Sequence, residues 1–181
     1  MPMQRRIALL PMAIALAGLA AHLFAVESNL GPPAGVALLA IPFFIDRRLP
    51  RDLRASVEEA HRRLTDSRCQ EILTDFADSA GRRLDVNLAS TGETAASYLG
   101  LVLFYDGRAT ERCADRHVLA WTAPGSRAVH ICWDQFSLYQ RFDKGYAADT
   151  LIHETLHTLG LGENPPEPRM ITAQVIARCG R

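Results

Sequence analysis

Two histidines, His153 and His157, stand four residues apart in the stretch HETLHTLGLGE, residues 153–163. In an α-helix, where successive residues are about 100° apart, these two side chains lie about 40° apart and one turn from each other. Two imidazoles at this separation can bind one metal ion, and Glu154 beside the first histidine can reach water on that ion. The spacing therefore predicts a metal site on a helix.

Zinc suits these residue types. It binds neutral imidazole nitrogens and lowers the pKa of bound water toward about 7. Glu154 can then take a proton from that water and later pass it to a leaving amine. A catalytic zinc has three protein ligands and one open position, so a third ligand is needed.

The residues after the helix offer that third ligand. Gly160 can adopt the left-handed conformation that ends a helix, so the chain can turn back and Glu163 can present an oxygen to the same ion. Two other acids stay open as alternatives: Glu167, and Asp149 one turn before His153. Asp149 also suits the first turn of the helix, where negative charge is favoured.

Several other polar residues receive no role. Three histidines of the expected domain, His61, His117 and His130, have no second metal-binding residue at ligand spacing. Tyr139 and Tyr146 could donate a hydrogen bond to the oxyanion of a transition state, but they also suit ordinary packing, so we assign them no role.

The eleven residues of the stretch resemble the H-E-x-x-H-x-x-G-x-x-H signature of metzincin zinc peptidases. The resemblance implies that His153 and His157 bind Zn²⁺, that Glu154 is the general base, and that position 163 supplies the third ligand. Glu163 stands where metzincins have histidine, and two histidines with one glutamate form an established catalytic zinc set.

The resemblance weakens outside this stretch. Metzincins have a methionine-containing turn beneath the zinc, and nothing around Met170 marks it as that turn. The tail ENPPEPRMITAQVIARCG is similar to the end of small exported bacterial proteins assigned as metallopeptidases. The resemblance implies a zincin-like domain that acts on a peptide or protein substrate.

Hydrophobic spacing predicts the elements around the site. Helices are expected over 51–65, 69–80 and 146–159, and strands over 99–105, 117–123 and 127–133. In the first of these helices the apolar residues Leu53, Val57, Ala60 and Leu64 recur at helical steps, and Gly81 is expected to cap the second. The last two strands are expected to form a hairpin about residues 124–126. In zincin-like folds an edge strand lines the cleft and pairs with extended substrate, so the resemblance implies this role for the hairpin.

These elements predict a single α+β domain. It would contain two N-terminal helices, a small, mostly antiparallel sheet, the active-site helix and an irregular tail. We assign residues 1–26 to a signal peptide or membrane anchor, 27–45 to an apolar linker or second short membrane segment, and 46–181 to the zincin-like domain.

The N-terminus predicts export. Arg5 and Arg6 precede the apolar run 7–26, which fits a cleaved signal peptide and is also near the length of about 20 residues that spans a bilayer. A second apolar stretch, 35–45, leaves open a helical hairpin that would return the domain to the cytoplasm. An extracytoplasmic domain, periplasmic or secreted and with a possible membrane tether, agrees better with the cysteines.

The four cysteines contain no C-x-x-C pair, so a structural zinc knuckle is not expected. In an exported domain they predict two disulfides. Three connectivities can be drawn, and we prefer Cys113 with Cys132 and Cys69 with Cys179. Four buried free thiols remain the alternative.

The charge pattern excludes nucleic acid as a partner. The formal net charge is zero, and 19 of the 20 basic residues are arginines scattered among acids. Our preferred interpretation is an exported zinc-dependent metallopeptidase. A non-catalytic exported module braced by metal and disulfides, and a zinc amidase that cleaves cell-wall crosslinks, are the two alternatives.

Overall fold

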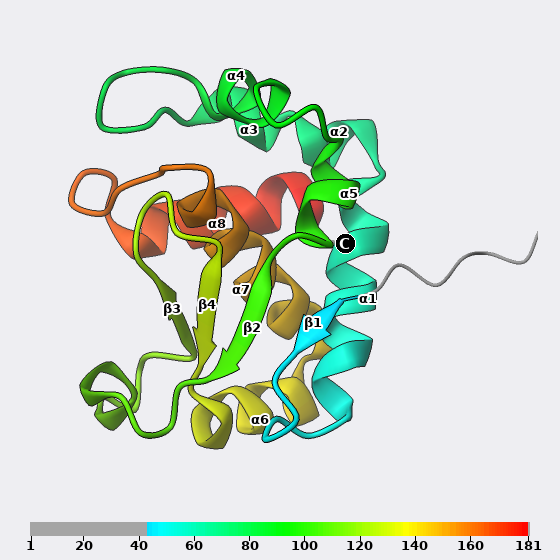
Figure 1. The fold of residues 1–181 in the computed structure, drawn as a ribbon, viewed down its shortest axis with the longest axis vertical. Helices are drawn as coiled ribbons and strands as arrows, with labels where there is room; N and C mark the ends of the chain where they lie inside the picture. Colours follow the sequence, from blue (N-terminus) through cyan, green and yellow to red (C-terminus); the bar gives the residue numbers. More distant parts are fainter. Residues whose placement is uncertain (1–42, 181) are drawn as a thin grey trace, which may run out of the picture. The chain divides into compact units, whose positions relative to one another are not determined.

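The computed structural model describes residues 43–180, in which helices pack around and against a four-stranded sheet (Figure 1). The expected α+β class is confirmed. The strands are β1 (Phe44–Ile45), β2 (Leu103–Asp106), β3 (Ala120–Thr122) and β4 (Ala128–Ile131). The helices are α1 (Asp52–Leu64), α2 (Ser67–Gln70), α3 (Ile72–Asp75), α4 (Leu84–Ala89), α5 (Ala95–Leu99), α6 (Trp133–Phe142), α7 (Lys144–Thr158) and α8 (Pro168–Cys179), with a 3₁₀ turn, η1, at Glu111–Ala114.

The strand order in the sheet is β1-β2-β4-β3. The predicted hairpin is confirmed, since β3 and β4 pair in antiparallel orientation. The expectation of a mostly antiparallel sheet is wrong, because β1 with β2 and β2 with β4 pair in parallel. Two parallel strands must be joined by a long crossover, which for β1 and β2 consists of helices α1 to α5. No short turn sequence marks such a connection, so the sequence contains no indication of the parallel pairing.

The sheet also includes residues that precede the expected domain start at Asp46. Phe44 and Ile45 pair with Leu103 and Phe104 on β2. The expected signal peptide or anchor, and the apolar stretch as far as residue 42, lie outside the described residues. Among residues 43–180, no helix combines the length and apolar character that a membrane span needs.

The predicted helix over 51–65 is α1, whose apolar positions are fully buried. The predicted helix over 69–80 is wrong, because the chain forms two short helices that end at Asp75. Gly81 caps no helix; it lies in a turn, with φ +78°, where the Asp78 side chain accepts hydrogen bonds from the backbone N–H groups of Ala80 and Arg82. An Asp side chain that binds nearby backbone in this way favours a turn over a helix.

Two further expectations change. Residue 99 was expected to open a strand, but Leu99 ends α5, and β2 begins at Leu103. The tail was expected to be irregular, but Pro168 begins α8, in the first-turn position where its missing N–H costs nothing. Helix α6, also not predicted, continues almost directly into α7.

Helix α7 lies at the centre of the domain, with α1, α6 and α8 packed against it and with β3 and β4 alongside (Figure 1). Every residue from Ala147 to Thr158 is buried except the half-buried Thr150. The helix predicted over 146–159 is confirmed, and it begins two residues earlier than expected, at Lys144.

Both preferred disulfides form. Cys69 of α2 is bonded to Cys179 at the end of α8, and Cys113 of η1 is bonded to Cys132 at the start of α6. Among residues 43–180 no cysteine is free. Two disulfides are consistent with an oxidising, extracytoplasmic environment.

A buried ion pair joins α1 to α7. Arg63 Nη1 donates to Asp149 Oδ1 at 2.7 Å, and both side chains are 7% exposed. Burial raises the pKa of Asp149, and Arg63 opposes this shift. Removing one partner of such a pair leaves an uncompensated buried charge.

We therefore expect Arg63→Met to lower the free energy of unfolding by about 3 kcal/mol near neutral pH. A buried Asp with a raised pKa costs stability once the pH exceeds its unfolded value, so the loss should be smaller near pH 4, where Asp149 can take up a proton. Urea unfolding at both pH values measures this. The double variant Arg63→Met with Asp149→Leu should be more stable than the single variant; equal or lower stability would contradict this explanation.

Candidate metal centre

The end of α7 is held by another helix. Asn87 of α4 donates from Nδ2 to the carbonyl oxygen of Leu159 at 2.9 Å and to Asp78 Oδ2 at 3.0 Å. Gly160 follows with φ +105°, and a Cβ there would lie 3.2 Å from the Asp78 Cβ atom. The positive φ favours glycine, and a side chain there would also crowd Asp78. The turn predicted at Gly160 is confirmed.

The turn fixes the orientation of the His157 imidazole. Its Nδ1 is 2.8 Å from the carbonyl oxygen of Leu161, just beyond the turn. Because a carbonyl oxygen only accepts, Nδ1 carries the proton and Nε2 is left with its lone pair. Burial lowers the pKa of His157, which favours the neutral imidazole that metal binding requires.

Helix α8 orients the other histidine in a similar way. Oγ1 of Thr172 is 3.0 Å from Nδ1 of His153 and can accept its proton. Outer hydrogen bonds of this kind hold metal-binding histidines in one tautomer. Both histidines therefore turn Nε2 toward the same point.

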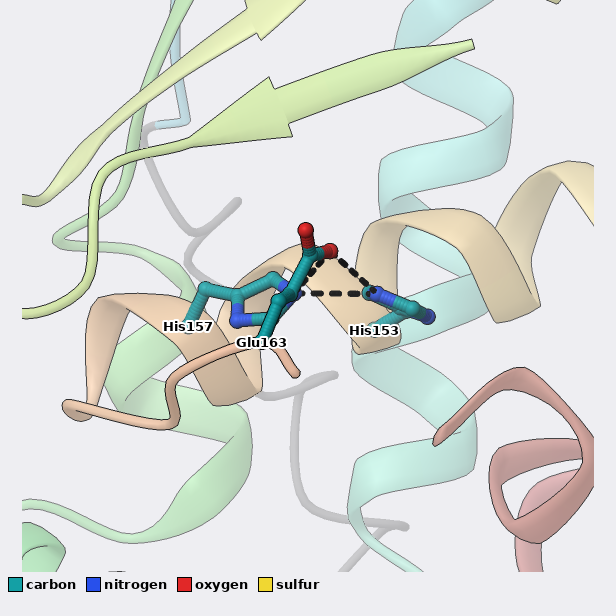
Figure 2. Close-up of side chains that lie close together, drawn as sticks. All are labelled: His153, His157 and Glu163. Atoms are coloured by element: carbon teal, nitrogen blue, oxygen red, sulfur yellow. Dashed lines mark hydrogen bonds and ion pairs between the residues drawn. The ribbon is translucent and has the colours of Figure 1, made fainter. Parts of the chain in front are cut away.

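Glu163 completes the group, as Figure 2 shows. The two Nε2 atoms are 3.0 Å apart, and Glu163 Oε1 lies 3.3 Å from His157 Nε2 and 3.9 Å from His153 Nε2. Two donor atoms on a tetrahedral zinc are about 3.3 Å apart. These three side chains therefore fit a zinc ion by donor type, by tautomer and by spacing. The neighbouring histidines, His153 first, lower the pKa of Glu163 and keep it ionised.

Glu154 lies beside this group and is 6% exposed. Its Oε2 atom has no hydrogen-bond partner among the described residues, and neither does Oγ1 of the buried Thr122. Burial raises the pKa of Glu154 to about 7, and His153, the nearby Thr122 hydroxyl and, more weakly, Arg112 act in the opposite direction. A carboxyl group with a pKa near neutrality can both accept and donate a proton.

The three donors and Glu154 open onto a cleft of about 220 Å³. Strand β3, at the edge of the sheet, lines it with residues 120–122, and Pro168 and Thr172 of α8 line it as well. The expectation that the hairpin lines the cleft is confirmed for β3. An edge strand has unpaired backbone groups that can bind an extended chain.

The two alternative third ligands lie elsewhere. Asp149 is paired with Arg63 inside the α1–α7 contact, and Glu167 is exposed and paired with Arg169 at 2.6 Å. Among residues 43–180, the group that could hold a metal ion consists of His153, His157 and Glu163.

The residues without an expected role are dispersed. His61 packs against Phe43, and His130 stacks on Trp121. His117 and Tyr146 line the cleft, whereas Tyr139 is 46% exposed and does not. Met170 is exposed on α8, so it forms no turn beneath the three donor side chains.

Arg112 and Thr172 line the cleft although they were not predicted to do so, and no individual role was predicted for Trp121 or Thr122 of the expected hairpin. None of them has a spacing relative to the histidines that could have indicated a shared site. Comparison of the chain with protein-family models, curated proteins and solved structures found no match. The interpretation of the site therefore depends on its geometry and chemistry.

Proposed function

We propose that the protein is a zinc-dependent metallopeptidase of zincin type that hydrolyses peptide bonds by attack of water. One observation carries the proposal: two histidine Nε2 atoms and one glutamate oxygen converge, and both histidine Nδ1 atoms are already engaged. Three donors instead of four are typical of a catalytic zinc site, which keeps one position for substrate or water.

In this proposal each residue of the site has a separate role in hydrolysis. Bound zinc would act as a Lewis acid that polarises the peptide carbonyl and makes water more acidic. Glu154 takes the proton of the attacking water and passes it to the leaving amine, and its buried Oε2 forms no hydrogen bond within the described residues. Strand β3 holds the substrate backbone beside the site, and Glu163 balances part of the metal's charge.

The location of the reaction follows from the cysteines and the N-terminus. Two disulfides favour an oxidising compartment, so we propose a periplasmic or secreted domain. Residues 1–26 would direct export and, if retained, would tether the domain to the membrane.

One experiment separates this proposal from the two alternatives. We expect the purified full-length protein to contain about one zinc per chain and to cleave casein, with activity lost in a chelator and restored by zinc. Release of peptide crosslinks from cell-wall fragments with casein left intact would favour the amidase. Stoichiometric zinc with neither substrate cleaved would favour the non-catalytic module.

A further inference from the structure

One cationic side chain lines the cleft. Of the residues around it, Arg112 of η1 is the single arginine or lysine, and the acids are Glu154 and Glu163. Arg112 is exposed, and within residues 43–180 it forms no ion pair and no side-chain hydrogen bond. Its charge nevertheless acts on both acids, adding weakly to the causes that lower their pKa values. The guanidinium of Arg112 therefore lies near the candidate metal site, and neither acid of the cleft forms an ion pair with it.

An aromatic side chain holds this guanidinium. The Arg112 Cζ atom lies 5.3 Å from the centre of a Trp121 ring, at cation–π distance. Trp121 is itself fixed: it stacks on His130 at 4.2 Å, and its Nε1 donates to Thr110 Oγ1 at 3.2 Å. A cation–π contact uses the face of the guanidinium and leaves its five N–H donors free.

The backbone of Arg112 is fixed as well. The next residue, Cys113, is bonded to Cys132, and its carbonyl oxygen accepts a hydrogen bond from Gln135 Nε2 at 3.0 Å. Both contacts tie η1 to the start of α6. A side chain that is already ordered on its neighbours loses little conformational entropy when a ligand binds.

We propose that Arg112 recognises a carboxylate of the substrate, so that the protein prefers peptides with an acidic side chain or a free C-terminal carboxylate close to the cleaved bond. This inference rests on the proposed peptidase function for the identity of the substrate. A planar guanidinium with unused donors matches a carboxylate through two parallel N–H···O bonds. Glu154 and Glu163 offset the charge of a bound zinc ion, and Arg112 is the remaining side chain of the cleft with a permanent positive charge, so it is the group that can bind a carboxylate beside the metal.

The test uses matched pairs of peptides. At each position around the cleaved bond, Glu is compared with Gln, and a free C-terminus is compared with its amide. We expect one pair to show at least about a tenfold higher kcat/KM for the acid. Preference for Glu would identify a side-chain carboxylate, and preference for the free C-terminus would identify the chain end.

Variants assign the preference to Arg112. Arg112→Gln should reduce the acid-to-amide ratio to near one, and Arg112→Lys should retain part of it, because a lysine keeps the charge but loses the paired geometry. Arg116→Gln is the matched control, since Arg116 is exposed close by and does not line the cleft. Its ratio should equal that of the wild type.

Peptide binding can also be measured in the absence of hydrolysis. Full-length, zinc-loaded Glu154→Gln protein is titrated with the same peptide pairs, and tryptophan fluorescence is followed, since Trp121 lies beneath Arg112. We expect tighter binding of the acid, with the difference lost when Arg112→Gln is added.

The outcomes separate the two proposals. Tighter binding of acids through Arg112 with no hydrolysis by the wild type would support this inference and contradict the peptidase function. Hydrolysis with equal rates for acid and amide, or a preference that survives Arg112→Gln, would overturn the inference and leave the peptidase function intact. No binding difference for any pair would also overturn it.

Discussion

Glu154→Gln should abolish hydrolysis while bound zinc stays at about one ion per chain. General acid–base catalysis contributes about 10²- to 10⁴-fold, and in the proposed mechanism one carboxyl group serves both proton transfers, so we expect kcat/KM to fall at least about 10³-fold. The substitution keeps size and shape in a buried position, and it removes the group that can take the proton. Steady-state kinetics and metal analysis on the same preparation measure both effects.

The matched control for this variant is Glu58→Gln. Glu58 is exposed on α1, and it does not line the cleft. Its activity and zinc content should equal those of the wild type. Turnover by Glu154→Gln close to the wild-type rate would remove Glu154 from the mechanism, and simultaneous loss of zinc would mean that Glu154 supports the metal and not the proton transfer.

Glu163→Ala should weaken zinc binding by about 100-fold or more, because it removes a donor and the negative charge nearest the ion. Loss of a partner that only orients a ligand already costs about 10- to 100-fold. Oε1 of Glu163 is the single oxygen in the group of three donors, and it lies within 4 Å of both Nε2 atoms. Competition with a chromophoric chelator gives the affinity.

Glu167→Ala is the control that the chain itself offers. Glu167 lies four residues further along and was an alternative third ligand, but it is exposed and paired with Arg169. Its loss should leave the zinc affinity unchanged. The reverse pattern, with wild-type affinity for Glu163→Ala and weakened affinity for Glu167→Ala, would show that the loop after Gly160 binds the ion in a different arrangement.

Local patterns predicted the elements that depend on neighbouring residues. Helix α1 follows from its apolar spacing, the β3–β4 hairpin from the Pro-Gly-Ser turn, and the end of α7 from Gly160. Each of these features is decided within a few residues, so the sequence contains the whole signal. The same holds for the pair His153 and His157, because helix geometry alone fixes their separation.

Elements that depend on distant residues were missed. The parallel pairing of β2 with β4 joins strands that are not consecutive in the sequence, and the chain turns near Asp78 because that side chain binds local backbone while Asn87 and Gly160 pack around it. Helix α8 begins at a proline that we associated with an irregular tail. The disulfide between Cys69 and Cys179 joins its end to α2, 110 residues earlier in the chain.

For the candidate site, the sequence by itself determined the donor types, the helix that presents two of them and the glycine that returns the chain to a third. Only the tertiary structure decided which acid meets the histidines, since Asp149 is taken by Arg63 and Glu167 turns outward. It also decided that Thr172 orients His153 and that Arg112, held on Trp121, faces the cleft. The physical reason is that spacing along the chain fixes distances only within one element, whereas contacts between elements depend on how their buried faces pack.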